Sequence, residues 1–128
     1  LYFGRLSMSA DNFASRVYMR LMAHFPLLAQ SDPQRALVIC FGVGNTASAI
    51  ALHDSVDQLD IVDLNPQVFA TAVEFPANRG VVQDPRVRLI RDDGRQFLRR
   101  PGARYDLITS EPPPPLAAGV DRLYSVEY

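Results

Sequence analysis

The feature that most constrains this sequence is a continuous apolar run, Ala36 to Phe41, followed at once by Gly42-Val43-Gly44. A short run that is apolar at every position is typical of a strand covered on both faces, as in a parallel sheet. Glycines directly after such a strand let the backbone turn tightly and come close to a ligand, since they carry no Cβ. The sequence therefore predicts a buried strand whose carboxyl end carries a loop suited to ligand binding.

Helix and strand patterns alternate along the rest of the chain. Ahead of the first strand, apolar residues recur at three- and four-residue steps over Asp11–Leu28 and predict an amphipathic helix that ends near Pro26; they are Phe13, Val17, Leu21, Met22, Phe25 and Leu28. After the first strand we expect a helix over Thr46–His53, a strand over Leu59–Val62, a helix from Pro66 to about Phe75 capped by Asn65, a strand over Val87–Ile90, a helix over Asp93–Arg99, a strand over Tyr105–Thr109 and a helix starting within 123–128. This order is typical of an α/β fold with a parallel sheet and helices on both faces.

The composition favours one folded domain spanning 1–128, with residues 1–35 as a helical lead-in and 36–128 as the core. Hydrophobic residues make up 48% of the chain and charged residues 21%, close to the globular average. The net charge is −1, and the arginines between residues 79 and 104 are interleaved with aspartates, as on a solvated face. We therefore expect no nucleic-acid partner.

The single cysteine bears on the cellular compartment. Cys40 cannot form an internal disulfide, and its apolar neighbours indicate a buried, apolar role. No apolar run approaches the roughly 18 residues that span a bilayer, and no signal-peptide pattern opens the chain. The sequence predicts an intracellular, cytoplasmic protein without a membrane partner.

Acidic residues follow each later strand, at the edge of the sheet where such folds bind ligands. Asp63 lies 19 residues beyond Gly44, a spacing at which an acidic side chain binds both ribose hydroxyls. Asp92-Asp93-Gly94 offers carboxylates to an adenine amino group, although helix capping explains the same residues equally well. Glu111 stands before four prolines and is a candidate general base or cation partner; an exposed loop glutamate is the alternative.

The two histidines are only weak candidates for a metal or catalytic site. His24 and His53 each lack a second metal-ligating residue nearby in sequence, so we expect no metal site.

Taken together, four segments resemble the spermidine synthase family: Ala36–Asp63, Asp84–Val87, Asp92–Leu98 and Tyr105–Ile108. The stretches Met22–Leu27 and Leu123–Tyr128 are also similar to that family. The resemblance implies a Rossmann-like fold of the S-adenosylmethionine-dependent methyltransferase type, with strand order 3-2-1-4 and a C-terminal part that is incomplete.

The resemblance also implies roles for individual residues. It places the nucleotide at Gly42, Gly44, Asp63, Leu64, Asp92, Asp93 and Gly94; the nucleotide would be S-adenosylmethionine, its decarboxylated form or the thioether product. It makes Glu111 the catalytic carboxylate, which takes a proton from the attacking amine, and Tyr18 a substrate residue near the polyamine.

Three positions depart from the family pattern. Val43 replaces an acid of the glycine loop, Pro114 replaces a second carboxylate after the fourth strand, and Met19 replaces a glutamine. An ammonium group left unpaired in an apolar cleft costs several kcal/mol. The resemblance thus predicts that the nucleotide half of the site is kept and the polyamine half is largely lost, which leaves an aminopropyl or methyl transferase whose acceptor is undefined.

Two rival hypotheses remain, together with one prediction about assembly. Gly42-x-Gly44-x-x-Ala47 with Asp63 also satisfies a dinucleotide fingerprint, so NAD binding is one rival. A binding or assembly module without catalysis, using Pro112–Pro115 as a rigid surface, is the other. Because the fourth strand would be an open edge, we predict a homodimer that pairs these edges or packs the uncovered faces.

Overall fold

The computed structural model describes residues 2–3, 6–7, 9–102 and 104–111. The elements are, in chain order, β1 (Tyr2–Phe3), β2 (Leu6–Ser7), α1 (Phe13–Leu28), β3 (Arg35–Ile39), α2 (Asn45–Ile50), β4 (Gln58–Asp63), α3 (Gln67–Ala70), the 3-10 turns η1 (Thr71–Glu74), η2 (Pro76–Asn78) and η3 (Val81–Gln83), β5 (Val87–Arg91), α4 (Gly94–Leu98) and β6 (Leu107–Ser110). The proline run, including Pro114, and the expected helix within 123–128 lie outside the described residues.

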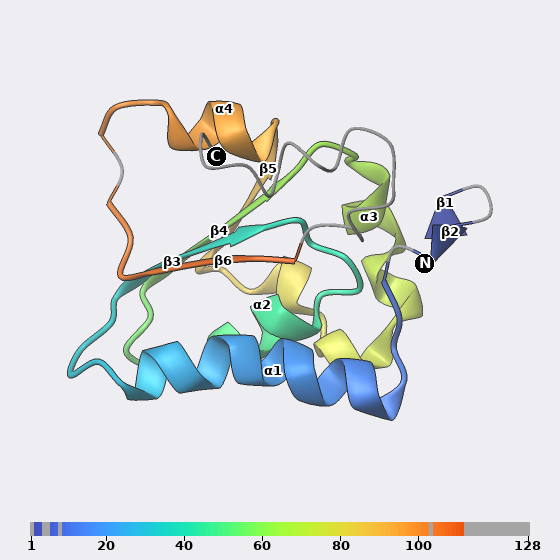
Figure 1. Cartoon of the computed structure of the whole chain (residues 1–128), viewed down its shortest axis with the longest axis horizontal. Helices are drawn as coiled ribbons and strands as arrows, with labels where there is room; N and C mark the ends of the chain where they lie inside the picture. Colours follow the sequence, from blue (N-terminus) through green and yellow to red (C-terminus); the bar gives the residue numbers. More distant parts are fainter. Residues whose placement is uncertain (1, 4–5, 8, 103, 112–128) are drawn as a thin grey trace.

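Four of the strands form one parallel sheet in the order β5-β4-β3-β6 (Figure 1). Counting from the first strand of the core, this is the predicted order 3-2-1-4, and it is confirmed. In the register of the sheet, Val38 of β3 lies opposite Ile61 of β4 and Thr109 of β6. The carboxyl ends of the strands therefore meet at one edge. The short strands β1 and β2 pair separately as an antiparallel hairpin, which the sequence did not predict.

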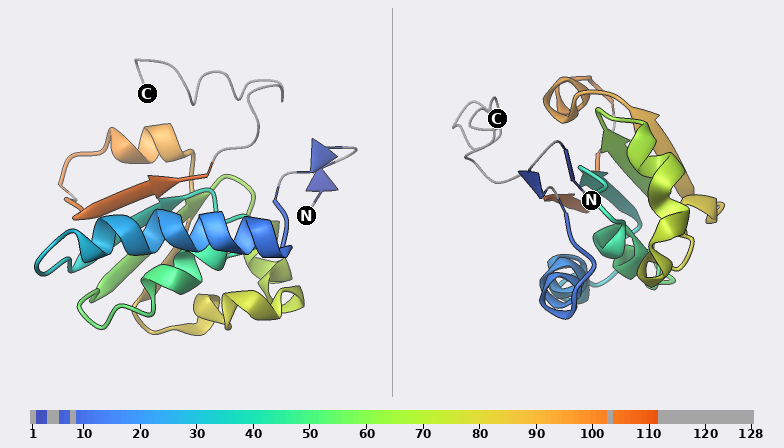
Figure 2. Two further views of the ribbon diagram at one scale, coloured as in Figure 1. Left: turned by 60° about the horizontal axis from the view of Figure 1, so that its bottom comes forward. Right: turned by 90° about the vertical axis from the view of Figure 1, so that its right-hand side faces the viewer.

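Helices cover both faces of the sheet, as predicted (Figure 2). On one face α1, α2 and the segment from α3 to η3 enclose the larger core, which contains Val38, Leu59 and Ile61. On the other face α4 lays Phe97 and Leu98 against a smaller cluster of Leu37, Ile39 and Val62. β3 and β4 are thus buried on both sides, which explains their nearly continuous apolar sequences.

Three helix boundaries differ from the predicted ones. α1 does not end near Pro26 but passes through it to Leu28, because a proline in the last turn removes only one backbone donor. The helix after Pro66 becomes 3-10 after Ala70; there the Thr71 hydroxyl donates to the carbonyl of Gln67 and competes with the helical pattern.

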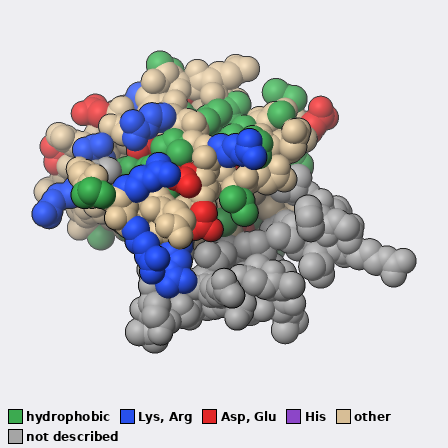
Figure 3. Space-filling model, turned by 90° about the horizontal axis from the view of Figure 1, so that it is seen from above, with side chains coloured by type: hydrophobic (Ala, Val, Ile, Leu, Met, Phe, Trp, Pro, Cys, Tyr) green, Lys and Arg blue, Asp and Glu red, His purple; other side chains and the backbone are tan. Residues whose placement is uncertain are grey.

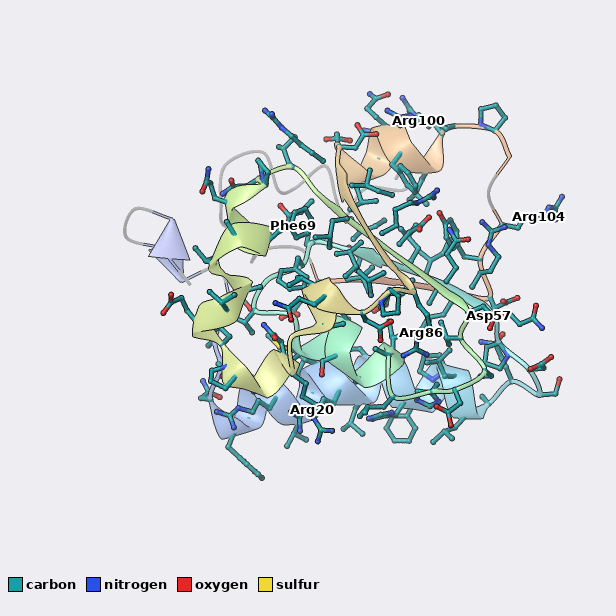
Figure 4. The ribbon with its side chains drawn as sticks, turned by 180° about the vertical axis from the view of Figure 1, so that it is seen from behind. Arg20, Asp57, Phe69, Arg86, Arg100 and Arg104 are labelled. Atoms are coloured by element: carbon teal, nitrogen blue, oxygen red, sulfur yellow. The ribbon has the colours of Figure 1, made fainter. Side chains whose placement is uncertain are left out.

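The predicted helix over Thr46–His53 ends three residues early, at Ile50. Arg86 binds the turn that follows α2 (Figure 4). Its guanidinium donates to the carbonyl oxygens of Ala51, at 2.6 Å, and of His53 and Val56. One arginine from the loop before β5 therefore satisfies three carbonyl groups of the turn between α2 and β4.

One charged group lies within the otherwise apolar interior of β4. The Asp60 side chain is fully buried, and it accepts hydrogen bonds from the Arg88 guanidinium at 2.6 and 3.0 Å and from the Tyr105 hydroxyl at 2.6 Å. Burial alone would raise the pKa of Asp60, but hydrogen bonds from Arg88, Tyr105 and Gln58 outweigh it and lower the pKa. Asp60 thereby links β4, β5 and the segment that leads into β6.

Most of the apolar residues that identified α1 lie outside its buried side. The buried side of the helix consists of Met19, Ala23 and Leu27. Of the six residues that carried the sequence pattern, five are exposed and Met22 is half-buried; the exposed ones are Phe13, Val17, Leu21, Phe25 and Leu28. Both sides of α1 are therefore apolar.

Among the described residues, no helix is long and apolar enough to cross a membrane. The arginines between residues 79 and 104 have acidic side chains as neighbours in the structure as well as in the sequence. Figure 3 shows arginine and acidic side chains together on the α4 side of the molecule. Arg86 pairs with Asp84 at 2.8 Å, and Arg100 pairs with Asp92 at 2.5 Å.

Candidate functional site

The loop after β3 requires its glycines. Gly42 and Gly44 have φ values of +57° and +85°, and the backbone amide of Gly44 donates to the Phe41 carbonyl at 2.9 Å, which closes the turn. A Cβ on Gly44 would lie 2.6 Å from the Phe41 ring, and one on Gly42 would lie 2.8 Å from Ser9 Oγ. Both positions combine left-handed backbone with a close contact, so the tight turn predicted from the sequence is present.

Asp63 at the end of β4 holds this loop in place. Its Oδ2 accepts from the backbone amide of Phe41 and its Oδ1 from that of Asn65, both at 2.9 Å. Each carboxylate oxygen keeps a further acceptor site, which is what binding two ribose hydroxyls requires. The next residue, Leu64, is 69% exposed and offers an apolar surface at the same edge of the sheet.

Asp92, Asp93 and Gly94 form the turn into α4 beside Asp63. The Asp92 amide donates to the Asp63 carbonyl at 3.2 Å, which joins the ends of β4 and β5. Asp93 is the N-cap of α4, since its Oδ1 accepts from the Gln96 amide at 2.9 Å. Helix capping, the alternative that the sequence left open, is therefore present.

Glu111 and Tyr18 meet at the end of β6, although 93 residues separate them in sequence. The Glu111 amide donates to the Ile39 carbonyl at 3.2 Å, which sets this residue beside the start of the glycine loop. The Tyr18 hydroxyl, from α1, donates to Glu111 Oε1. The structure thus brings the expected catalytic carboxylate and the expected substrate tyrosine into direct contact.

The environment of Glu111 and Tyr18 changes the pKa of both side chains. Burial raises the pKa of Glu111 above the ordinary glutamate value, and the hydrogen bond from Tyr18 offsets part of this shift. Burial, the hydrogen bond to Glu111 and the Glu111 charge all raise the pKa of Tyr18. Glu111 is therefore a stronger proton acceptor than a solvated glutamate, and Tyr18 remains protonated as a donor to it.

Cys40 belongs to this edge as well, a position that its apolar neighbours in sequence did not reveal. It is half-buried rather than buried, and it has a φ of +70°, which is uncommon for a residue with a side chain. Burial, followed by the charges of Asp63, Glu111 and Asp93, raises the pKa of the Cys40 thiol to about 12. Three predicted site carboxylates therefore lie close enough to act on one sulfur atom.

Residues ahead of α1 also contribute, and no sequence motif marked them. Ser9 packs against Gly42, as described above. Asp11 Oδ1 accepts from Asn45 Nδ2 at 3.0 Å and from Arg16 Nε at 2.8 Å. The lead-in segment is thus tied to the glycine loop on one side and to the first turns of α1 on the other.

Two of the three positions that depart from the family pattern point into the core. The side chains of Val43 and Met19 are each 1% exposed. The Val43 carbonyl accepts from Asn78 Nδ2 at 3.2 Å, and the Met19 carbonyl accepts from Thr46 Oγ1 at 3.2 Å. Valine and methionine suit these dry surroundings, where an unpaired acid or amide would be costly.

The histidines, isolated in sequence, are partners in space. His24 Nδ1 and His53 Nε2 lie 2.9 Å apart, between α1 and the turn after α2. Helix packing brings the two rings together although they are 29 residues apart in sequence, a contact that the sequence could not show. Within the described part of the chain, no three His, Cys, Asp or Glu side chains gather as a metal site would require.

Comparison with protein families gives a match over almost the whole chain. The Spermine/spermidine synthase domain family matches residues 15–128. Polyamine aminopropyltransferase 1 of Pseudomonas aeruginosa is 33% identical over 112 residues, which cover 86% of this chain and 38% of that protein. A polyamine aminopropyltransferase of Yersinia pestis is 29% identical over 114 residues. The chain thus spans about 38% of the length of these relatives.

Solved structures show the same fold. A spermidine synthase in complex with the transition state analogue AdoDATO superimposes with a TM-score of 0.79 at 24% identity, over 88% of this chain and 39% of that one. Spermidine synthase from Thermotoga maritima gives 0.69 at 24% identity, over 75% and 34%. The SAH-bound methyltransferase PaMTH1 of Podospora anserina gives 0.56 at 21% identity, over 80% and 42%. The fold is therefore the Rossmann-like one of these transferases.

Proposed function

Because the chain belongs to the spermine/spermidine synthase domain family, we propose that it is the nucleotide-binding part of a group transferase. Its ligand is S-adenosylmethionine, the decarboxylated form or the thioether product, and the group transferred is aminopropyl or methyl. The contact between Tyr18 and Glu111 carries the proposal, because it joins the two expected reaction residues at the edge where the glycine loop lies. The names of the relatives, polyamine aminopropyltransferases, support the same reaction class.

In the proposed complex the nucleotide lies across the carboxyl ends of β3, β4 and β5. Gly42 and Gly44 allow it to approach the backbone, and the free acceptor sites of Asp63 bind the ribose. Asp93 uses the carboxylate oxygen that does not cap α4 to accept from the adenine amino group, and Asp92 and Gly94 shape the same turn. Leu64 supplies an apolar contact for the nucleoside.

Glu111 then acts on the acceptor. An amine with a pKa near ~10 is mostly protonated at neutral pH and becomes a nucleophile only after losing that proton. Glu111 takes the proton, the nitrogen lone pair forms the new bond to the transferred carbon, and the carbon–sulfur bond of the sulfonium breaks. The electron pair of that bond stays on sulfur as the thioether. The raised pKa of Glu111 favours this role, and the Tyr18 hydroxyl orients its carboxylate.

The acceptor in this proposal is not a typical polyamine. The inward positions of Val43 and Met19 leave the glycine loop and α1 without the polar groups that the family pattern has there. Asp11, an acid ahead of α1, is already bonded to Arg16 and Asn45 and so does not replace these polar groups. We therefore propose that the acceptor is not a linear polyamine. We also propose that the protein is cytoplasmic and forms a homodimer. A binding module without turnover remains the second candidate.

Calorimetric titration of the purified protein with the three S-adenosyl ligands tests the proposal. We expect at least one to bind, and we expect Asp63→Ala to weaken that binding by more than tenfold, because it removes both ribose acceptors. Glu111→Gln should bind the ligand normally but abolish transfer, which separates binding from catalysis. Binding of NADH in place of all three ligands would contradict the proposal. Bound nucleotide without turnover by any acceptor amine would favour the module.

A further inference from the structure

The side chain of Asn78 joins the glycine loop to the segment from α3 to η3. Asn78 lies in η2 and is 2% exposed. Its Nδ2 donates to the Val43 carbonyl at 3.2 Å and to the Ala72 carbonyl at 2.8 Å, and its Oδ1 accepts from the Gly80 amide at 2.9 Å. Both amide protons and the carbonyl oxygen of this side chain are therefore engaged.

The hydrogen-bonding groups of asparagine suit this position. A leucine here would leave the buried carbonyls of Val43 and Ala72 without these bonds, and buried carbonyls without partners are costly. An ionised aspartate has no proton to donate to either carbonyl. The side chain thus serves as a double donor to two carbonyls from different parts of the chain.

The bond to Val43 acts on one peptide group of the glycine loop. The Val43 carbonyl belongs to the same peptide group as the Gly44 amide, which donates to the Phe41 carbonyl at 2.9 Å. The group is therefore held at both ends, by the turn on one side and by Asn78 on the other. Because a peptide group is planar, holding both ends restricts the backbone rotations beside it. The left-handed φ of +85° at Gly44 is thus supported by a bond from outside the loop.

The position of Asn78 is itself fixed by several contacts. η2 packs against α2, the helix that follows the glycine loop (Figure 1). The next two residues, Arg79 and Gly80, both have left-handed φ values, +56° and +67°, and the bond from the Gly80 amide to Asn78 closes this turn. A Cβ on Gly44 would lie only 3.0 Å from Asn78 Cβ, so this residue also packs directly against the loop.

We propose that Asn78 is a positioning residue for the nucleotide, because it holds the glycine loop in the conformation that lets an S-adenosyl ligand approach the backbone at Gly42 and Gly44. This inference rests on the proposed function, since it concerns the same ligand. Asn78 acts through the Val43 carbonyl rather than through contact with the ligand. No sequence motif marked it, because its role depends on a bond between residues 35 positions apart.

Calorimetric titration of the purified protein with S-adenosylmethionine, its decarboxylated form and the thioether product tests the proposal. We expect Asn78→Ala to raise the dissociation constant of the ligand that binds by roughly tenfold, the effect of losing one hydrogen bond to a buried carbonyl. Urea unfolding shows whether the variant is folded under the conditions of the titration. In a protein that remains almost fully folded, a loss of stability alone leaves the dissociation constant unchanged.

The matched control is Val56→Ala. Val56 is 1% exposed and belongs to the larger core, but it precedes β4 and so lies at the other end of the strands from the glycine loop. We expect this variant to lose stability and to change the dissociation constant by less than about twofold. Equal weakening of binding by the two variants would overturn the proposal.

Amide hydrogen exchange gives a second measurement that needs no ligand. Exchange of the Gly44 amide should be roughly tenfold faster in Asn78→Ala than in the unaltered protein, whereas in Val56→Ala it should rise no more than exchange across β3. Asn78→Ser, which keeps one hydroxyl donor, should show the same changes to a smaller degree and serves if the alanine variant does not fold. Unchanged exchange at Gly44 in a folded variant would refute the role of Asn78.

Failure of this proposal differs from failure of the proposed function. A protein that binds none of the three ligands contradicts the proposed function. Folded variants at Asn78 that bind as tightly as the unaltered protein contradict only the positioning role.

Discussion

Replacement of Gly44 by alanine tests the reasoning about the glycine loop most directly. Two costs combine at this position. The backbone has a φ of +85°, where a residue with a Cβ costs roughly 1–2 kcal/mol relative to glycine. The new Cβ would also lie 2.6 Å and 2.9 Å from two carbons of the Phe41 ring and 3.0 Å from Asn78 Cβ.

The second cost is large because the neighbours cannot move freely. Phe41 is packed edge-to-face against Phe69, with ring centroids 5.5 Å apart, and Asn78 donates two hydrogen bonds to backbone carbonyls. Overpacking of a filled core typically costs about 1–3 kcal/mol. An alanine also restricts the unfolded chain, which stabilises the folded state by roughly 0.4–1 kcal/mol. We therefore expect Gly44→Ala to lower the free energy of unfolding by about 2–4 kcal/mol.

Gly80→Ala is the matched control. Gly80 has a similar left-handed φ of +67°, but the nearest atom to a new Cβ there is the end of the Gln83 side chain, at 3.8 Å. Only the backbone cost applies, and the restriction of the unfolded chain offsets part of it, so the loss should be about 0–1.6 kcal/mol. Urea unfolding followed by circular dichroism measures both variants against the unaltered chain. Equal losses for the two variants, or a loss below about 0.5 kcal/mol for Gly44→Ala, would refute the reasoning.

Three further predictions concern titrating groups. Because burial raises the pKa of Glu111, the acid limb of the pH–rate profile for group transfer should lie above pH 4.5; a limb at or below this value would contradict the role of Glu111. Because burial, His53 and Arg20 lower the pKa of His24, the unfolded state binds more protons below about pH 6.5. The free energy of unfolding should then fall as the pH drops from 7.5 to 5.5, and in His24→Gln this fall should be smaller. The Cys40 thiol, with a pKa of about 12, should react slowly with a disulfide reagent at pH 8, and unfolding in urea should make it fast; equal rates would contradict the environment described here.

Most of the fold could be predicted from sequence because its signals are local. An apolar run with glycines after it specifies a buried strand and a tight turn, and three repeats of strand and helix specify a parallel sheet. Asp63 and Asp93 could be found for the same reason, since each stands at a fixed distance from a strand end. Their roles toward a ligand remain predictions.

Some helix boundaries, and the buried side of α1, could not be predicted from the sequence. α2 ends at Ile50, and the carbonyls of the turn after it bind Arg86, which is 36 residues further along the chain. The apolar spacing of α1 correctly predicted a helix but could not show which side meets the sheet, because both sides are apolar. Only packing against α2 and β6 selected Met19, Ala23 and Leu27 as the buried side.

The sequence by itself thus determined the order of elements, the glycine loop and the set of acids at the strand ends, because each depends on residues close together in the chain. Only the tertiary structure decided which distant groups meet. The contact of Tyr18 with Glu111 joins residues 93 positions apart, and that of His24 with His53 joins residues 29 apart. No local pattern encodes such contacts, because they arise when α1 is packed against the sheet and α2.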